Sequence, residues 1–128
     1  MIAGRGTVRR RAAEARGRRA ETWATWLLRA KGYRILARRW RSRAGEIDII
    51  ARRGRTLALV EVKARDDAAV AAGAIDTRAQ TRLARAANAY LGARPDLAQM
   101  NLRFDVVLVA PGRWPRHLAD AWRPAGDR

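Results

Sequence analysis

Hydrophobic and polar positions near the start of the chain predict a long helix. Between residues 11 and 31, large apolar residues recur at i, i+3, i+4 and i+7, which is the spacing of one helix face. That face, which we expect to enter the core, consists of Trp23, Trp26, Leu27 and Ala30. Glu21 lies on nearly the opposite side and would face solvent or a cleft. Gly32 is a favourable residue for ending the helix.

Three short segments after this helix have the patterns of β-strands. Polar turns separate these segments, and Gly54 is at the centre of the second turn. Their bounds are residues 33–41, 46–51 and 57–64. Alternation along EIDIIA would place its two acidic residues on one face and Ile47 and Ile49 on the other. We therefore expect a meander of three strands.

A second helix and a fourth strand follow a polar loop at 65–73. The helix spans 76–91, and its apolar face is formed by Leu83, Ala86, Ala87 and Tyr90, with Gln80 on the same side. Residues 104–110 form the fourth strand, and RHLADAWRP near the end would add a short edge strand. A strand–helix–strand connection favours parallel pairing. The expected fold is one α/β domain with a mixed sheet, in the order helix–strand–strand–strand–helix–strand.

Length and composition set the limits of this domain. The 128 residues suffice for one core, which we assign to 11–123, with a basic, flexible N-terminus at 1–10 and a tail at 124–128. No run of 18 apolar residues is present, and the N-terminus lacks the apolar region of a secretory signal. Cysteine is absent, which excludes disulfides and thiolate catalysis. We expect a cytoplasmic protein without a membrane partner.

The net charge of +16 indicates a polyanionic partner, most often nucleic acid. A coding bias towards arginine is the alternative explanation, because only Lys31 and Lys63 among the 28 basic residues are lysines. Such a bias would explain arginine in place of lysine, but it would not explain the excess of bases over acids.

Candidate chemistry lies where the second and third strands pair. A hairpin turn near Gly54 would bring Asp48 beside Glu61, and two adjacent carboxylates repel unless a positive group lies between them. Oxygen ligands favour Mg²⁺ or Mn²⁺. Lys63 lies two residues beyond Glu61, on the same face, where it would contact whatever the metal binds. The alternative is a cross-strand ion pair at a sheet edge, which contributes little.

Other polar and aromatic residues are open to two interpretations. Three arginines of the second helix share one face, which is either solvated or binds phosphates: Arg78, Arg82 and Arg85. Gln80 is either a buried amide or a substrate contact. We expect the five tryptophans to pack rather than stack on bases. His117 is expected to be structural.

The pattern GEID–x12–EVK resembles the active-site motif of the PD-(D/E)xK, or restriction-endonuclease-like, nucleases, with Asp48, Glu61 and Lys63 at the motif positions. Successive blocks from Gly17 to Trp122 resemble the YraN-type uncharacterised family, and the most specific of them are AGEIDIIARR and LVEVKAR. The resemblance implies a restriction-endonuclease-like core related to archaeal Holliday junction resolvases. Ile47 stands where the motif has its leading proline, and Ala79 stands where a lysine is expected in the second helix.

By this resemblance, a metal-dependent nuclease would hold Mg²⁺ (or Mn²⁺) on Asp48, Glu61 and the Val62 carbonyl. Lys63 would orient water or stabilise the transition state, and Glu21 would complete the site. Phosphates would be gripped without sequence readout by Arg65, Arg78, Arg82 and Arg85, with Gln80 orienting a ligand or touching the substrate. The substrate would be DNA, branched or recombining, and by analogy a homodimer would offer two sites for two strands.

Two other functions remain open from the sequence. The protein would either bind nucleic acid with this fold but without turnover, or act as a basic adaptor for a protein or ribosomal partner. A basic adaptor has no need of a metal site, so metal binding that depends on Asp48 would count against it.

Overall fold

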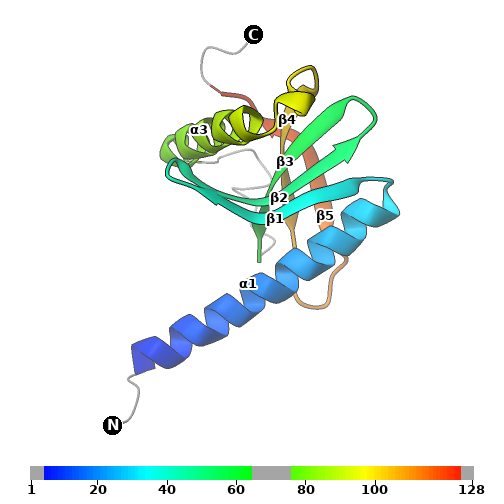
Figure 1. The fold of residues 1–128 in the computed structure, drawn as a ribbon. Coiled ribbons are helices and arrows are strands. Elements are labelled where there is room, and N and C mark those ends of the chain that lie inside the picture. Colours follow the sequence, from blue (N-terminus) through cyan, green and yellow to red (C-terminus); the bar gives the residue numbers. More distant parts are fainter. Residues whose placement is uncertain (1–4, 65–75, 125–128) are drawn as a thin grey trace.

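The computed structural model describes residues 5–64 and 76–124. A central sheet of five strands lies between two helices, as Figure 1 shows. In chain order the elements are α1 (Arg5–Ala30), β1 (Arg34–Ser42), β2 (Gly45–Arg53), β3 (Thr56–Lys63), α3 (Thr77–Ala93), a 3₁₀ turn (Pro95–Leu97), β4 (Asn101–Leu108) and β5 (Arg116–Trp122). The expected α/β fold is confirmed, including the edge strand near the end of the chain.

The sheet is mixed because the chain crosses over once. Strands β1, β2 and β3 form an antiparallel meander, β3 pairs with β4 in parallel, and β4 pairs with β5 antiparallel. The β2–β3 turn has Gly54 at its first central position with φ 59°, a conformation that glycine adopts without strain. The crossover from β3 to β4 contains α3, as the strand–helix–strand pattern predicted.

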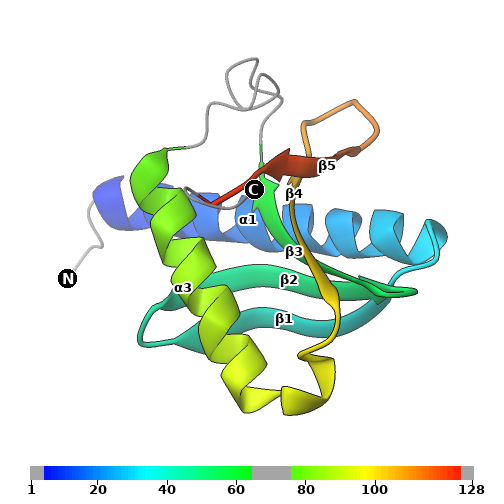
Figure 2. The ribbon, with the colours of Figure 1, turned by 90° about the horizontal axis from the view of Figure 1, so that it is seen from above.

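The two helices cover opposite faces of the sheet (Figure 2). On one face, residues of α3 such as Ala87 and Tyr90 pack with Leu57 and Leu59 of β3. On the other face, Leu28 of α1 packs in a second cluster, which includes alternate residues of the same strands. Burial of these two apolar layers is the main stabilising term for the fold.

Helix α1 ends just before Gly32, as predicted, but it differs from the prediction in its start and in the face that it buries. It begins at Arg5, so it includes much of the segment that we expected to be flexible. At its other end, Tyr33 N–H donates to the Leu28 carbonyl and Gly32 has φ 90°, which is the Schellman arrangement expected for glycine. The buried face is not the predicted one, because Trp23 and Trp26 are 51% and 61% exposed.

The buried face of α1 includes a small side chain and a hydroxyl that forms its hydrogen bond within the helix. Ala24 and Leu28 are fully buried, and so is Thr25, whose hydroxyl donates to the Glu21 carbonyl at 2.8 Å. Small residues let the helix approach the sheet closely, and a hydroxyl that bonds to its own helix is not costly to bury. The prediction was wrong because it considered only large hydrophobic side chains. It did not consider small residues that allow close approach, or a hydroxyl that bonds within its own helix.

The alternation of β2 breaks at Asp48. Ile47 belongs to the cluster on the α3 face, whereas Ile49 belongs to the cluster on the α1 face. The expectation that both isoleucines share a face was therefore wrong. Arg39 on the neighbouring strand β1 has φ 50°. It lies between the two residues that pair with Ile49 and Ile47. This left-handed residue locally changes the direction of β1 next to Asp48.

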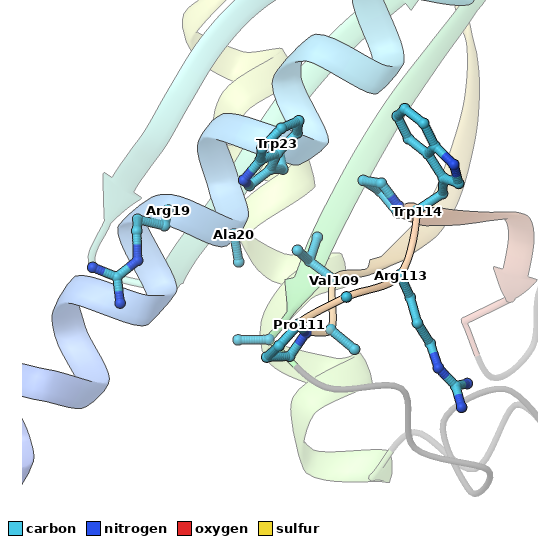
Figure 3. Close-up of a pocket in the computed structure, with 11 residues that line it drawn as sticks. Arg19, Ala20, Trp23, Val109, Pro111, Arg113 and Trp114 are labelled. Carbon is cyan, nitrogen blue, oxygen red and sulfur yellow. The ribbon is translucent and has the colours of Figure 1, made fainter.

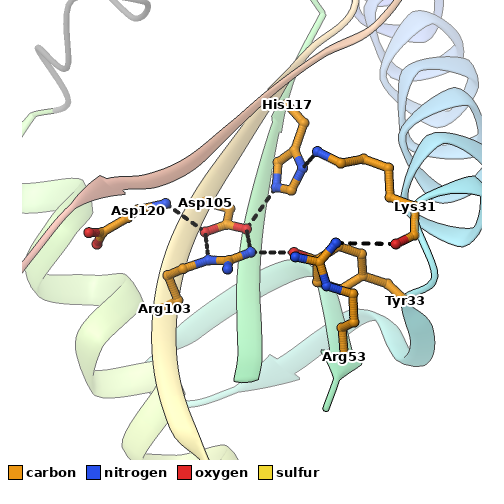
Figure 4. A network of polar contacts seen from close by, with 7 residues as sticks. All are labelled: Lys31, Tyr33, Arg53, Arg103, Asp105, His117 and Asp120. Carbon is orange, nitrogen blue, oxygen red and sulfur yellow. Dashed lines mark hydrogen bonds and ion pairs between the residues drawn. The ribbon is translucent and has the colours of Figure 1, made fainter. Parts of the chain in front are cut away.

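A buried polar network ties β5 and the end of α1 to the sheet (Figure 4). Fully buried Asp105 accepts two hydrogen bonds from the Arg103 guanidinium, one from the main-chain N–H of Asp120 and one from His117 Nε2. Lys31 Nζ contacts His117 Nδ1, so Nδ1 accepts and Nε2 carries the proton. His117 is therefore a structural residue, as expected.

Candidate active site

The candidate site lies at one end of the sheet, where β2 begins and β3 ends. Gly45 at the start of β2 has φ 150°, and a Cβ there would lie 3.6 Å from the main-chain oxygen of Arg82 in α3. The positive φ favours glycine, whereas the distance to Arg82 is an ordinary van der Waals contact. This contact brings α3 beside the GEID segment, so the helix borders the site.

Asp48 is held against β3 by its own side chain. Its Oδ2 accepts a hydrogen bond of 2.8 Å from the main-chain N–H of Val62. Burial raises the pKa of Asp48 to about 6, although the Val62 hydrogen bond opposes this shift, and repulsion from Glu21, Glu61 and Glu46 raises the pKa further. Asp48 therefore lies close enough to the carboxylates of Glu21 and Glu61 for their charges to raise its pKa.

Glu61 and Lys63 form the second part of the site. Lys63 Nζ is 3.1 Å from Glu61 Oε1. The other carboxylate oxygen of Glu61, Oε2, is buried and has no hydrogen-bond partner in the described part of the chain. A buried carboxylate oxygen without a donor is costly, so it marks a position that a cation or water would fill.

Glu21 reaches the site from α1 but has a partner of its own. Its carboxylate forms an ion pair with Arg39 of β1, the residue with positive φ. Glu21 is only 9% exposed, so it does not face open solvent. No sequence pattern indicates that Arg39 takes part, because the pairing depends on a local break of strand geometry.

The donor set partly fits the predicted metal site. Within residues 5–64 and 76–124, no three Asp, Glu or His side chains converge closely enough to hold a metal ion, so Glu21 is not a third direct ligand here. The predicted set needs only two carboxylates and a carbonyl. The Lys63 carbonyl points towards β4, because it accepts a hydrogen bond from the Val109 N–H. Main-chain groups alternate in direction along a strand, so the N–H and carbonyl of Val62 point the other way, towards Asp48. Asp48, Glu61 and Val62 thus present oxygen donors of the kind that Mg²⁺ prefers.

The predicted nucleic-acid contacts lie on α3, next to the site. Arg78, Arg82 and Arg85 are exposed and line a shallow pocket at the start of this helix. Gln80 is half-buried. Arg65 lies outside the described residues. Three arginines on one exposed helix face make a positive surface beside the carboxylates.

The tryptophans divide into packed and exposed groups. Trp40 packs edge-to-face on Tyr90 with a centroid distance of 5.2 Å, and Trp122 stacks on Phe104, so packing is confirmed for these two. Trp114 is 86% exposed, so the packing expected for it was wrong. Trp23, Trp26 and Trp114 all present large apolar surface to solvent, which needs another explanation.

Fold and site together define a class: a mixed α/β domain with an Asp and a Glu-x-Lys side by side at one sheet end. The model of the Uncharacterised protein family UPF0102 matches residues 20–109, and the chain belongs to this family. The YraN-type resemblance is thereby confirmed. None of the helices in the described part of the chain is long and apolar enough to cross a membrane.

Relatives match over most of their length. A UPF0102 protein of Parvibaculum lavamentivorans is 62% identical over 108 residues, which are 84% of this chain and 81% of the relative. One from Methylorubrum extorquens is 54% identical over 118 residues, and UPF0102 protein Mmar10_3014 of Maricaulis maris is 52% identical over 122 residues; each match covers 92% of both chains.

Proposed function

We propose that this protein is a Mg²⁺-dependent nuclease that hydrolyses phosphodiester bonds of DNA, with branched or recombining DNA as its substrate. The observation that carries the proposal is the arrangement at the end of β3. Asp48 is held at Val62, beside Glu61, whose buried Oε2 has no hydrogen-bond partner among residues 5–64 and 76–124, while Lys63 contacts the other oxygen. A cross-strand ion pair alone would not need a second, repelled carboxylate.

Asp48, Glu61 and the Val62 carbonyl would hold the ion. When bound, Mg²⁺ would lower the pKa of water and neutralise charge on the scissile phosphate. Lys63 would then orient the attacking water or donate to a phosphate oxygen as negative charge develops in the transition state. Glu21, fixed by Arg39, would keep the pKa of Asp48 raised through repulsion and would contact the ion only through water.

Phosphate binding would come from the exposed arginines of α3. Arg78, Arg82 and Arg85 carry full charges and line one surface next to the site. Contacts of this kind position a duplex without reading its sequence. They would place the DNA backbone across the carboxylates. There, a water would attack phosphorus, one P–O bond would break and the leaving oxygen would take a proton.

The test is cleavage of labelled linear, single-stranded, flapped and four-way-junction DNA in Mg²⁺, Mn²⁺ or EDTA. Wild type should cleave only with metal, and Asp48→Asn and Lys63→Ala should abolish cleavage while they bind DNA in EDTA. Glu46→Gln is a matched control, because Glu46 is an exposed carboxylate of the same strand that pairs with Arg41. Circular dichroism would show whether each variant is folded.

Metal binding provides a second readout that does not depend on turnover. Mn²⁺ should raise the melting temperature of wild type, and the increase should disappear in Asp48→Asn and Glu61→Gln but persist in Glu46→Gln. DNA binding without cleavage and without metal-induced stabilisation would contradict the nuclease and favour the binding protein. Neither DNA binding nor metal binding would favour the basic adaptor.

A further inference from the structure

An apolar pocket of about 530 Å³ lies beside the candidate site and has no role in the chemistry above (Figure 3). It is formed between α1 and the segment that connects β4 to β5. Its volume falls within the range of about 300–1,000 Å³ that is usual for small-ligand sites. The lining includes Ala20, Trp23, Val109, Pro111, Trp114 and Pro115.

Two exposed tryptophans distinguish this pocket from an ordinary surface hollow. Trp23 projects from α1 and Trp114 from the β4–β5 connection, and they are 51% and 86% exposed. Indole rings contribute strongly to stability when they are buried in a core, yet both of these remain in water. Concentrated apolar surface of this kind marks a binding site.

The surroundings of the pocket are positively charged. Arg19 and Arg113 also line it, and none of the described lining residues is acidic. The whole chain carries a net charge of +16. An occupant should therefore combine a flat apolar surface with negative charge, and a nucleotide has both properties.

The pocket adjoins the candidate active site along α1 and β3, although Asp48, Glu61 and Lys63 do not line it. Ala20 precedes Glu21 in α1, and Ala64 directly follows Lys63. On the other wall, Val109 N–H donates to the Lys63 carbonyl at 2.8 Å. Strand alternation turns Ala64 to the opposite face from Lys63, so a strand that crosses this end of the sheet would place a base in the pocket and a phosphate further along at Lys63.

We propose that the pocket between Trp23 and Trp114 binds an unpaired nucleobase of the strand that enters the candidate active site, which makes single-stranded or frayed junction DNA the preferred substrate. This inference depends on the proposed nuclease function. A base inside a duplex is stacked on both sides and cannot enter the pocket, whereas an unpaired base can stack on indole. Arg19 and Arg113 contact the adjoining phosphates.

Binding in EDTA tests the pocket without any need for cleavage. Fluorescence anisotropy would compare a labelled single-stranded 12-mer of thymidine with a duplex of equal length. Trp23→Ala and Trp114→Ala should each weaken single-strand binding about fivefold or more, the usual effect of one lost stacking contact. Duplex binding should change less than twofold, and Trp114→Phe, which keeps an aromatic ring, should restore most of the affinity.

Trp26→Ala is the matched control. Trp26 lies on the same helix, is 61% exposed and does not line the pocket. This variant should leave single-strand binding unchanged. Equal losses in all three tryptophan variants would overturn the proposal, since they would indicate a general effect of exposed aromatic surface.

Two further outcomes would also overturn it. An abasic strand that binds wild type as well as the thymidine strand would show that no base is stacked. A wild-type dimer that Trp114→Ala dissociates, with single-strand binding intact, would identify a second copy of the chain as the occupant. Failure of nuclease activity is separate, because an inactive protein can still show the expected single-strand preference in EDTA.

Discussion

The carboxylate of Asp48 accepts a hydrogen bond from the main-chain N–H of Val62 across the β2–β3 pair. This bond fixes a half-buried acid next to other carboxylates, and the pKa of Asp48 is raised to about 6 as a result of burial and of repulsion by Glu21, Glu61 and Glu46. An arrangement that is unfavourable for the folded protein alone is typical of functional sites.

Asp48→Asn should therefore stabilise the protein in the absence of metal. The folded pKa of about 6 lies above the ordinary value of 3.8, so the contribution of Asp48 is fully present below pH 3.8 and is lost as the pH rises through 6. A shift of about two pKa units corresponds to about 3 kcal/mol. Because Asp48 is only partly buried, we expect a gain of about 1–2 kcal/mol at pH 7.5.

Urea unfolding in EDTA at pH 4, 5.5 and 7.5 measures this effect. The advantage of Asp48→Asn over wild type should be small at pH 4 and should grow with pH. Glu46→Gln removes an exposed carboxylate from the same strand, whose repulsion of Asp48 is the weakest of the three, so its trend should be much smaller. A variant that is equally destabilised at all three pH values would show that Asp48 is a structural residue instead.

Lys63→Arg should abolish cleavage although the positive charge is kept. Lys63 Nζ lies 3.1 Å from Glu61 Oε1 in a partly buried position, where a planar guanidinium cannot replace a compact ammonium. Loss of a transition-state donor reduces the rate by about 100-fold or more. Single-turnover cleavage would measure the rate, while DNA binding in EDTA should stay within about threefold because the charge is unchanged.

Lys31→Arg is a natural control for this exchange, since Lys31 and Lys63 are the two lysines of the chain. Lys31 contacts His117 and lies outside the candidate site. Its exchange should leave cleavage unchanged. Wild-type activity in Lys63→Arg would indicate that Lys63 acts through charge alone.

Strand order and the motif positions could be predicted from the sequence because they follow local periodicity and turn residues. Gly54 fixes the β2–β3 hairpin, and the hairpin alone brings Asp48 near Glu61. The crossover helix likewise required a parallel β3–β4 pair. These features depend on short-range rules.

Long-range contacts account for what was mispredicted. Periodicity ranks Trp23 above Ala24, yet close packing of α1 on the sheet favours the smaller side chain. The positive φ of Arg39 breaks the alternation of the paired strand near Asp48, and no local signal in the sequence indicates it. The exposure of Trp23 on α1 is explained instead if its indole ring binds a ligand.

Asp105→Asn should strongly destabilise the fold. Asp105 is fully buried and accepts hydrogen bonds from Arg103, His117 and the Asp120 N–H. Burial raises its pKa, but these hydrogen bonds outweigh it and lower the pKa to about 2. Removing one partner of a buried ion pair costs about 3–5 kcal/mol, so a loss near 3 kcal/mol is expected for the amide.

The pH dependence gives a sharper test of Asp105. Its folded pKa is below 3.8, so its contribution is present above pH 3.8 and is lost as the pH falls towards 2. The difference in unfolding free energy between wild type and Asp105→Asn should narrow over that range. Asp120→Asn is the control, because the Asp120 side chain is exposed and asparagine suits its φ of 53°. A constant difference at every pH would contradict the assignment.

The arginine face of α3 should determine the salt dependence of DNA binding. Replacing Arg78, Arg82 and Arg85 together by glutamine should reduce the slope of log K against log salt by up to about 3, because each lost phosphate contact removes about 0.9. Titrations of a duplex in EDTA at several salt concentrations measure the slope. The matched control replaces three exposed arginines around the β2–β3 turn, at the far end of the sheet: Arg34, Arg52 and Arg55. Equal reductions in both triple variants would mean that net charge, rather than this face, binds the DNA.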